Sequence, residues 1–85
     1  MSTNFKYKIM FDPSVRNIFV LRNYFETFGC SVLISKSDEE RKANAKSLIG
    51  WLSLDFQKYN TITLFFDNDV NTKDIKSKLD LIEIA

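Results

Sequence analysis

The chain has 85 residues, of which 45% are hydrophobic and 14% aromatic, with two glycines, one proline and one cysteine. This composition excludes a disordered, collagen-like or low-complexity chain, and it leaves no cysteine partner for an internal disulfide. The net charge of +1 and the lack of histidine exclude a strongly basic nucleic-acid or membrane surface, histidine-dependent catalytic triads and histidine-based zinc sites.

The N-terminal segment predicts a strand followed by a turn. Residues 5–11 alternate apolar and polar side chains, which is typical of a strand with one buried face. The apolar face consists of Phe5, Tyr7, Ile9 and Phe11. Residues 12–14 read Asp-Pro-Ser, a sequence that favours a turn or the cap of a following helix.

The next segment predicts a helix and a second strand. Residues 15–28 carry apolar side chains at helical spacing, and Val15 and Phe19 widen the face that we expect to be buried. Gly29 fits the position that directly follows a helix, where a left-handed backbone is common. Residues 30–36 alternate apolar and polar side chains again and predict a strand.

The second half of the chain predicts two strands and two helices. Residues 37–40 form a polar turn, and residues 41–45 form a weaker, more exposed strand that pairs back across it. A short helix is expected over residues 47–54. Residues 61–66 are the strongest strand candidate, because three apolar side chains face one way. A final helix starts at Thr72, with apolar residues spaced by four and three.

These elements predict an α+β protein with the order β-α-β-β-α-β-α. One arrangement buries every apolar stripe: an open-faced β-sandwich in which three helices lie on one face of a four-stranded antiparallel sheet. No repeat, linker or shift in composition divides the chain. We therefore expect one domain that spans residues 1–85.

One segment resembles a known protein family. Residues 43–56 read ANAKSLIGWLSLDF. This sequence resembles the start of the second helix in HPr phosphocarrier proteins of the bacterial phosphotransferase system, where a stretch such as K-S-I-M-G-V-M-S-L-G is found. The match is closest to the Gram-positive form. The element order and the total length also fit an HPr domain, so the resemblance implies the HPr-like open-faced sandwich for the whole chain.

The resemblance breaks down where HPr proteins carry their active site. The family has a G-x-H-A-R-P-A loop after the first strand, whose histidine accepts the phosphoryl group. Counting back from Ser47 without gaps places Arg16 at the position of that histidine, and a slip of one residue would place Asn17 there. Neither side chain can replace the imidazole. The resemblance therefore implies a paralogue without the carrier reaction, similar to the catabolite-repression Crh proteins, which lack the histidine and keep the serine.

Ser47 has two interpretations. Serine is a preferred helix N-cap, because its hydroxyl oxygen accepts a hydrogen bond from a free backbone N–H of the first turn. The serine at the matching position of Gram-positive HPr is phosphorylated by a dedicated kinase, and the resemblance implies the same regulation here. Both interpretations fit the sequence, since a phosphate is compatible with a helix N-terminus.

Several apolar residues of the helix at 47–54 are not needed for the core. We expect Trp51, Leu54 and Phe56 to supply its buried face. The remaining apolar residues then form either a second, shallow edge of the core or a docking patch for a protein, as the resemblance implies. The expected partner-binding residues are Arg16, Lys46, Leu48, Ile49 and Leu52.

Two positions differ from the family, and the single cysteine is interpreted from its strand alone. Asp55 and Tyr59 stand where HPr proteins usually have glycine, so a positive φ at either position would be strained. Cys30 alternates with the apolar residues of its strand, which favours a small core residue over a reactive nucleophile.

The favoured function is therefore that of a non-catalytic regulatory or adaptor protein of the HPr type, and not of an enzyme. The alternatives are a phosphocarrier that uses an acceptor other than histidine and an unrelated interaction domain of the same topology. Expected partners are phosphotransferase-system components, HPr kinase or a transcription regulator, and neither nucleic acid nor membrane. We expect a cytoplasmic monomer or weak homodimer with no cofactor and no metal.

Overall fold

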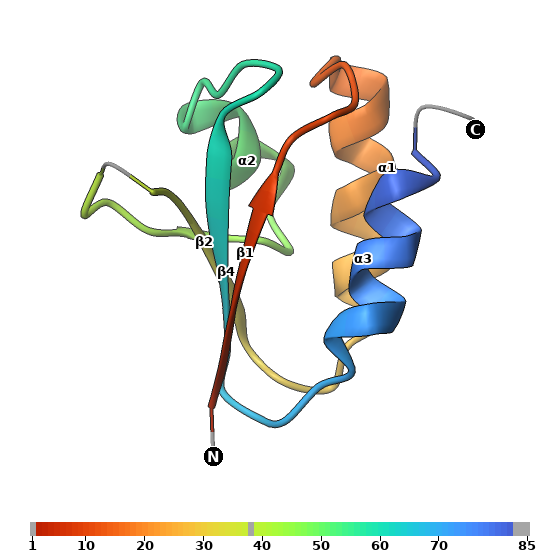
Figure 1. The fold of residues 1–85 in the computed structure, drawn as a ribbon. Helices are drawn as coiled ribbons and strands as arrows, with labels where there is room; N and C mark the ends of the chain where they lie inside the picture. Colours follow the sequence, from red (N-terminus) through yellow and green to blue (C-terminus); the bar gives the residue numbers. More distant parts are fainter. Residues whose placement is uncertain (1, 38, 83–85) are drawn as a thin grey trace.

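The computed structural model describes residues 2–37 and 39–82, and its elements follow the predicted order β-α-β-β-α-β-α (Figure 1). The elements are β1 (Thr3–Lys8), α1 (Val15–Glu26), β2 (Val32–Lys36), β3 (Ala43–Asn44), α2 (Leu48–Ser53), β4 (Thr61–Phe66) and α3 (Thr72–Asp80). No helix in these two ranges is long and apolar enough to cross a membrane.

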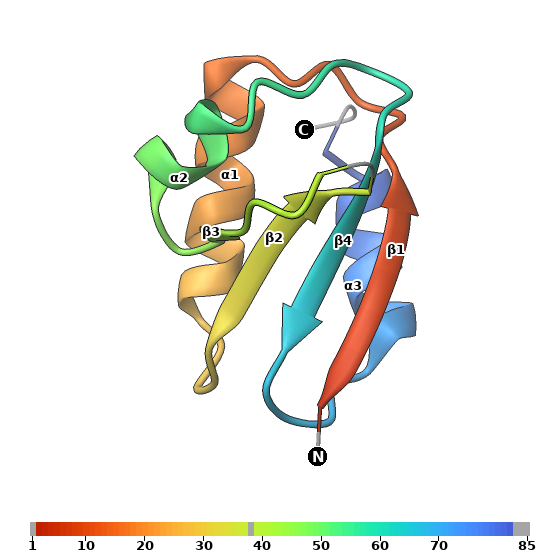
Figure 2. The ribbon, with the colours of Figure 1, turned by 90° about the vertical axis from the view of Figure 1, so that its left-hand side faces the viewer.

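The four strands form one antiparallel sheet in the order β1-β4-β2-β3. Tyr7 pairs with Ile62 and Ile34 pairs with Leu64, so the apolar faces of the three long strands coincide. Helices α1 and α3 lie against this face, and α2 lies beside α1 near the β3 edge (Figure 2). The predicted α+β open-faced sandwich is confirmed.

The predicted strand 5–11 is displaced toward the N-terminus. β1 begins at Thr3 and ends at Lys8. Ile9 instead exchanges backbone hydrogen bonds with the loop before β4: its N–H donates to the Asn60 carbonyl oxygen at 2.8 Å, and its own carbonyl accepts from Tyr59 at 2.7 Å. Ile9 and Phe11 are fully buried. Their side chains therefore continue to point into the core like those of β1, although the pairing of β1 with β4 ends at Lys8.

The other boundaries also differ from the pattern-based prediction. α1 ends at Glu26 with Thr27 as its C-cap, and Gly29 has no positive φ, so it does not serve as the left-handed terminator. β2 begins at Val32 and β3 is limited to Ala43–Asn44. The strand predicted over 41–45 is therefore too long: only Ala43 and Asn44 pair with β2, and the Arg41 guanidinium donates to the Ser53 carbonyl oxygen at 2.7 Å.

The helices and the sheet share one hydrophobic core. Phe25 of α1 is fully buried and stacks on the Trp51 indole of α2, with ring centroids 5.9 Å apart and an interplanar angle of 17°. Trp51 also meets Phe56 edge-on at 5.5 Å. Its indole N–H donates to the buried carbonyl oxygen of Ala45 at 2.6 Å. These contacts fix α2 against α1, so exposed residues of α2 are held in a defined orientation.

A hydrogen-bonded carboxylate on α3 makes folding sensitive to acid. Asp80 accepts a hydrogen bond from the Tyr7 phenol of β1 at 2.7 Å and from the Lys76 ammonium at 2.8 Å. The hydrogen bond from Lys76 is the largest cause that lowers the pKa of Asp80 in the folded chain, and the bond from Tyr7 adds to it. A lowered carboxyl pKa contributes stability above the pKa of the unfolded chain, and this contribution is lost as the pH falls through the folded value.

We therefore expect the Asp80→Asn variant to be less stable than the parent protein at neutral pH, with the gap closing as the pH falls below about 4, the ordinary carboxyl value. Urea unfolding at several pH values, followed by circular dichroism, measures the gap. Asp69→Asn is a suitable control, because the Asp69 carboxylate is exposed and none of the described residues pairs with it. A gap that stays constant across this pH range would contradict the prediction.

Candidate functional site

Ser47 is the N-cap of α2. Its backbone is extended, with φ −109° and ψ 121°, and its hydroxyl oxygen accepts the N–H of Gly50 at 3.1 Å. The Ser47 carbonyl oxygen accepts the N–H of Trp51, which begins the helical hydrogen bonding. The capping role predicted for Ser47 is confirmed. Its side chain is only half-buried, so the hydroxyl lies at the surface at the start of α2.

Gly50 lets α2 approach the chain at β3. A Cβ atom at this position would lie 2.9 Å from the Asn44 carbonyl oxygen, 3.3 Å from the Ser47 Cβ and 3.4 Å from the Ala43 Cβ. The first distance is shorter than real Cβ contacts allow. The glycine of the K-S-L-I-G sequence is therefore required by a backbone contact, which also keeps Ser47 close to β3.

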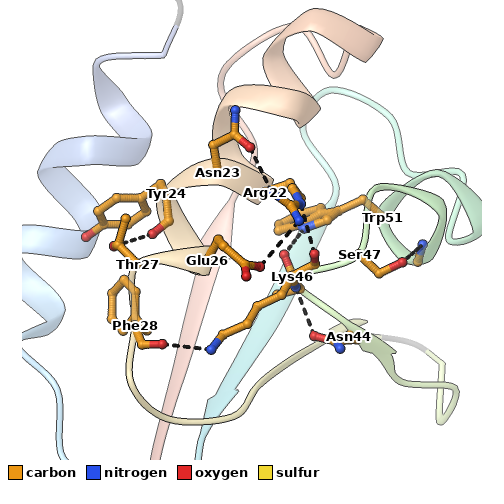
Figure 3. Close-up of polar contacts among 12 residues, drawn as sticks. Arg22, Asn23, Tyr24, Glu26, Thr27, Phe28, Asn44, Lys46, Ser47 and Trp51 are labelled. Atoms are coloured by element: carbon orange, nitrogen blue, oxygen red, sulfur yellow. Dashed lines mark hydrogen bonds and ion pairs between the residues drawn. The ribbon is translucent and has the colours of Figure 1, made fainter.

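Lys46 joins the start of α2 to α1. Its ammonium donates to the Phe28 carbonyl oxygen at 2.7 Å, just beyond the end of α1, and its own carbonyl accepts the Nε–H of Arg22 at 3.0 Å (Figure 3). Arg22 also forms an ion pair with Glu26 at 3.4 Å. A cation near the C-terminal carbonyls of a helix is favourable. Lys46 therefore has a structural role that the sequence pattern did not indicate.

Exposed apolar residues occur on both α1 and α2, which pack side by side. On α2, Ile49 is 79% exposed and Leu52 44%, whereas Leu48 is half-buried and packs against the core. On α1, Val15 is 60% exposed and Phe19 50%. The prediction that Val15 and Phe19 widen the buried face is wrong.

The helical spacing explains this exposure. Val15 and Phe19 lie on the same face of α1 as Arg22, whose guanidinium reaches the start of α2. At the other end of α2, Leu52 and Trp51 line a hollow of about 70 Å³ together with Pro13. Ile18 of α1 lines the same hollow, so α2 lies along α1. We call the exposed apolar set along this junction the α1–α2 surface: Val15, Phe19, Ile49 and Leu52.

Arg16 and Asn17, the two candidates for the phosphoacceptor position, lie in the first turn of α1. Asn17 is fixed locally: its backbone N–H donates to the Ser14 hydroxyl at 3.2 Å, and its side-chain amide donates to the Asp12 carbonyl oxygen at 2.7 Å. Arg16 is exposed, and its guanidinium makes no hydrogen bond or ion pair within the described residues. Arg16 is thus available to a partner from the first turn of α1.

The structure gathers most of the residues that the sequence singled out. Ser47, Leu48, Ile49 and Leu52 all belong to α2 or its cap, whereas Arg16 is an exposed residue of α1. The ammonium of Lys46 is directed to the Phe28 carbonyl. Neither partner binding nor modification is tested by this geometry, so the assignment of these residues as a site stays a prediction.

Three solved proteins share this fold over nearly the whole chain. HPr-C-His from Thermoanaerobacter tengcongensis has a TM-score of 0.69 and 25% identity, covering 98% of this chain and 91% of that chain. Phosphocarrier protein HPr from Bacillus anthracis str. Ames has a TM-score of 0.74 and 17% identity, covering 95% of each chain. A histidine-containing phosphocarrier protein of Mycoplasma has a TM-score of 0.73 and 18% identity, covering 93% and 92%.

These similarities establish the HPr-like fold that the segment 43–56 predicted. The sequence itself matches no protein-family profile and no curated protein. The histidine that gives the Mycoplasma protein its description has no counterpart of the same type in this chain, which contains no histidine.

Proposed function

We propose that this protein is a non-catalytic regulatory or adaptor module of the HPr type, which acts in the cytoplasm by binding protein components of the phosphotransferase system, HPr kinase or a transcription regulator. The observation that carries the proposal is the α1–α2 surface. It exposes Phe19, Ile49 and Leu52 on a fold shared with phosphocarriers, in a chain without the histidine that accepts phosphoryl groups.

The chemistry of the surface supports binding better than catalysis. Apolar side chains that remain exposed in a small protein are typical of a protein-interaction site, and arginine is common at such sites. Arg16 lies in the first turn of α1, next to Val15. The described residues hold no group of three or more Cys, Asp or Glu side chains that could bind a metal ion.

Ser47 is the proposed regulatory position. Ser47 precedes Ile49 by two residues, so a phosphate there would place about two negative charges at the start of the helix that carries Ile49 and Leu52. The N–H of Gly50, which the hydroxyl oxygen now accepts, could be accepted by a phosphoryl oxygen instead. Phosphorylation would then change the charge of the docking surface while the cap of α2 is kept.

The phosphorylation test is the intact mass of the protein after two separate incubations. One contains phosphoenolpyruvate and the general phosphotransferase enzyme, and the other contains ATP and HPr kinase. We expect one phosphate from the kinase only, and none in Ser47→Ala. The control is Ser53→Ala, which removes a second serine of α2. A phosphate gained from phosphoenolpyruvate would identify a carrier with another acceptor and overturn the proposal.

The binding test uses isolated phosphotransferase-system proteins and HPr-binding regulators as probes, at up to high micromolar concentration. Ile49→Asp should weaken the strongest of these complexes at least about 10-fold, because a charge would replace the most exposed apolar side chain of the surface. Leu81→Asp is the control, since Leu81 is an exposed apolar residue, 53% accessible, that follows α3 instead of lying on the α1–α2 surface. Absence of any complex would favour an unrelated interaction domain.

A further inference from the structure

β1 is the outermost strand of the sheet on the side away from α2. It pairs with β4 along its whole length, and no strand of the described residues pairs with its other side (Figure 2). An unpaired strand edge presents backbone N–H and C=O groups that water or a further strand must satisfy. The residues along this free edge therefore determine what kind of strand could pair with it.

The direction of the backbone groups of β1 follows from the hydrogen bonds at its end. Ile9, one residue beyond β1, directs both its N–H and its carbonyl oxygen toward the segment before β4. In an antiparallel ladder this direction alternates from residue to residue. The residues whose N–H and C=O groups point to the free edge are therefore Asn4, Lys6 and Lys8. A bond on the far side of β4 agrees, because Ser37 donates its N–H to the Thr61 carbonyl oxygen at 3.0 Å, so Thr61 faces β2 and not Lys8.

The side chains of the two lysines lie on the face of the sheet that the helices leave open. Their neighbours Phe5 and Tyr7 belong to the core side, and alternation places Lys6 and Lys8 on the opposite side. Both lysines are exposed, and neither forms an ion pair with a described residue. The β4 residues opposite them are both threonine. Two positive charges therefore border the free edge on this face.

The core side of the same edge is apolar and well ordered. Phe5 is half-buried and packs against the core, with its ring centroid 6.3 Å from that of Tyr7. The Tyr7 hydroxyl donates to Asp80 of α3 at 2.7 Å. β1 is therefore held by β4 on one side and by α3 behind it, so an added strand would meet an edge that is already in place. It would meet cations on one face and an aromatic ring on the other.

We propose that the free edge of β1 binds an extended acidic segment of a partner protein, which adds to the sheet as a fifth strand. Side chains of a strand alternate between the two faces. Acidic residues at every second position would lie opposite Lys6 and Lys8, and apolar residues between them would lie beside Phe5. The edge shares no residue with the α1–α2 surface, so the inference does not depend on the proposed function.

A second copy of this chain fits the edge less well than an acidic segment. Antiparallel pairing of two β1 strands centred on Lys6 would place this lysine directly opposite its own copy. Like charges that face each other across a strand pair destabilise it, and lysines on an edge strand oppose self-association for this reason. The same lysines favour a strand of opposite charge, which makes the edge selective.

The test titrates the full chain with a synthetic heptapeptide, Thr-Glu-Val-Glu-Val-Glu-Thr, blocked at both ends. The readout is amide hydrogen exchange, followed residue by residue in two-dimensional NMR spectra. In the free protein, the N–H groups of Lys6 and Lys8 should exchange faster than those of Phe5 and Tyr7, which face β4. At saturation the peptide should slow exchange at Lys6 and Lys8 at least about 10-fold, because an added strand accepts these N–H groups.

A charge exchange tests whether the lysines select the partner. Lys6→Glu should weaken binding of the acidic peptide about 10-fold and should permit binding of the matching peptide Thr-Lys-Val-Lys-Val-Lys-Thr. Lys6 is the better choice, because the Lys8 ammonium also lies 5.9 Å from the Tyr59 ring centroid. Lys73→Glu is the matched control, since it makes the same change of charge at an exposed residue of α3. Its affinity should change less than twofold.

Four outcomes would overturn the proposal. The first is binding that leaves the exchange of Lys6 and Lys8 unchanged, which would indicate a contact through charge alone. The second is equal binding of Glu-Glu-Glu-Val-Val-Thr-Thr, which has the same composition without the alternation. The third is an affinity that Lys6→Glu does not reduce, or no binding at about 1 mM peptide. The fourth is protection of the same N–H groups by self-association of the free chain, which would identify a second copy as the occupant.

Discussion

Replacement of Gly50 by alanine is expected to lower the free energy of unfolding by about 1–3 kcal/mol. In an ordinary helix interior the same change would raise stability by about 1 kcal/mol, because alanine has the higher helix propensity. Here the added Cβ would lie 2.9 Å from the Asn44 carbonyl oxygen. That oxygen belongs to the backbone, which cannot rotate away, so α2 must move from β3 and strain the hydrogen bond that the Ser47 N–H donates to the same oxygen at 3.0 Å.

The chain supplies a matched control in its other glycine. A Cβ at Gly29 would meet no atom within 4 Å, and Gly29 has no positive φ. Gly29→Ala should therefore leave stability unchanged or raise it slightly. Urea unfolding of both variants measures the difference directly. Equal stabilities of the two variants would show that α2 does not need the close approach, and would remove the structural reason for glycine in the K-S-L-I-G sequence.

The sequence predicted correctly the elements that the pattern of neighbouring residues determines. Thr61–Phe66 matches the predicted strand residue for residue. β4 lies between β1 and β2, so its apolar side chains face the core along the whole strand and alternate regularly with polar ones. Helix α2 with its cap residues, Ser47 and Leu54, spans the predicted range 47–54. The positive φ values of Asp55 and Tyr59, 48° and 75°, occur at the two positions where the family resemblance indicated glycine.

Tertiary contacts account for what the sequence did not reveal. Lys46 donates to Phe28, which lies 18 positions earlier in the chain, and no local pattern reports such a bond. Val15 and Phe19 repeat at helical spacing like core residues, but the same face carries Arg22, which reaches α2 from the side. The charged Arg22 at the same helical spacing indicates that this face of α1 lies outside the core.

Replacement of Trp51 by phenylalanine is expected to lower the free energy of unfolding by about 2–4 kcal/mol. Two losses combine. The buried carbonyl oxygen of Ala45 loses the indole N–H that donates to it at 2.6 Å, and the smaller ring leaves space between Phe25 and Phe56. A chain of this length has a total stability of about 4–13 kcal/mol, so the loss is a large fraction of the whole.

Circular dichroism is the suitable probe of urea unfolding for this variant, because Trp51 is the only tryptophan and fluorescence is lost with it. Phe25→Leu separates the two losses, since it reduces ring volume on the same stack and leaves the Ala45 carbonyl bonded. Trp51→Phe should be the more destabilising of the two by about 1 kcal/mol. If it is not, the indole hydrogen bond contributes little, and stacking on Phe25 alone holds α2 and its exposed residues against α1.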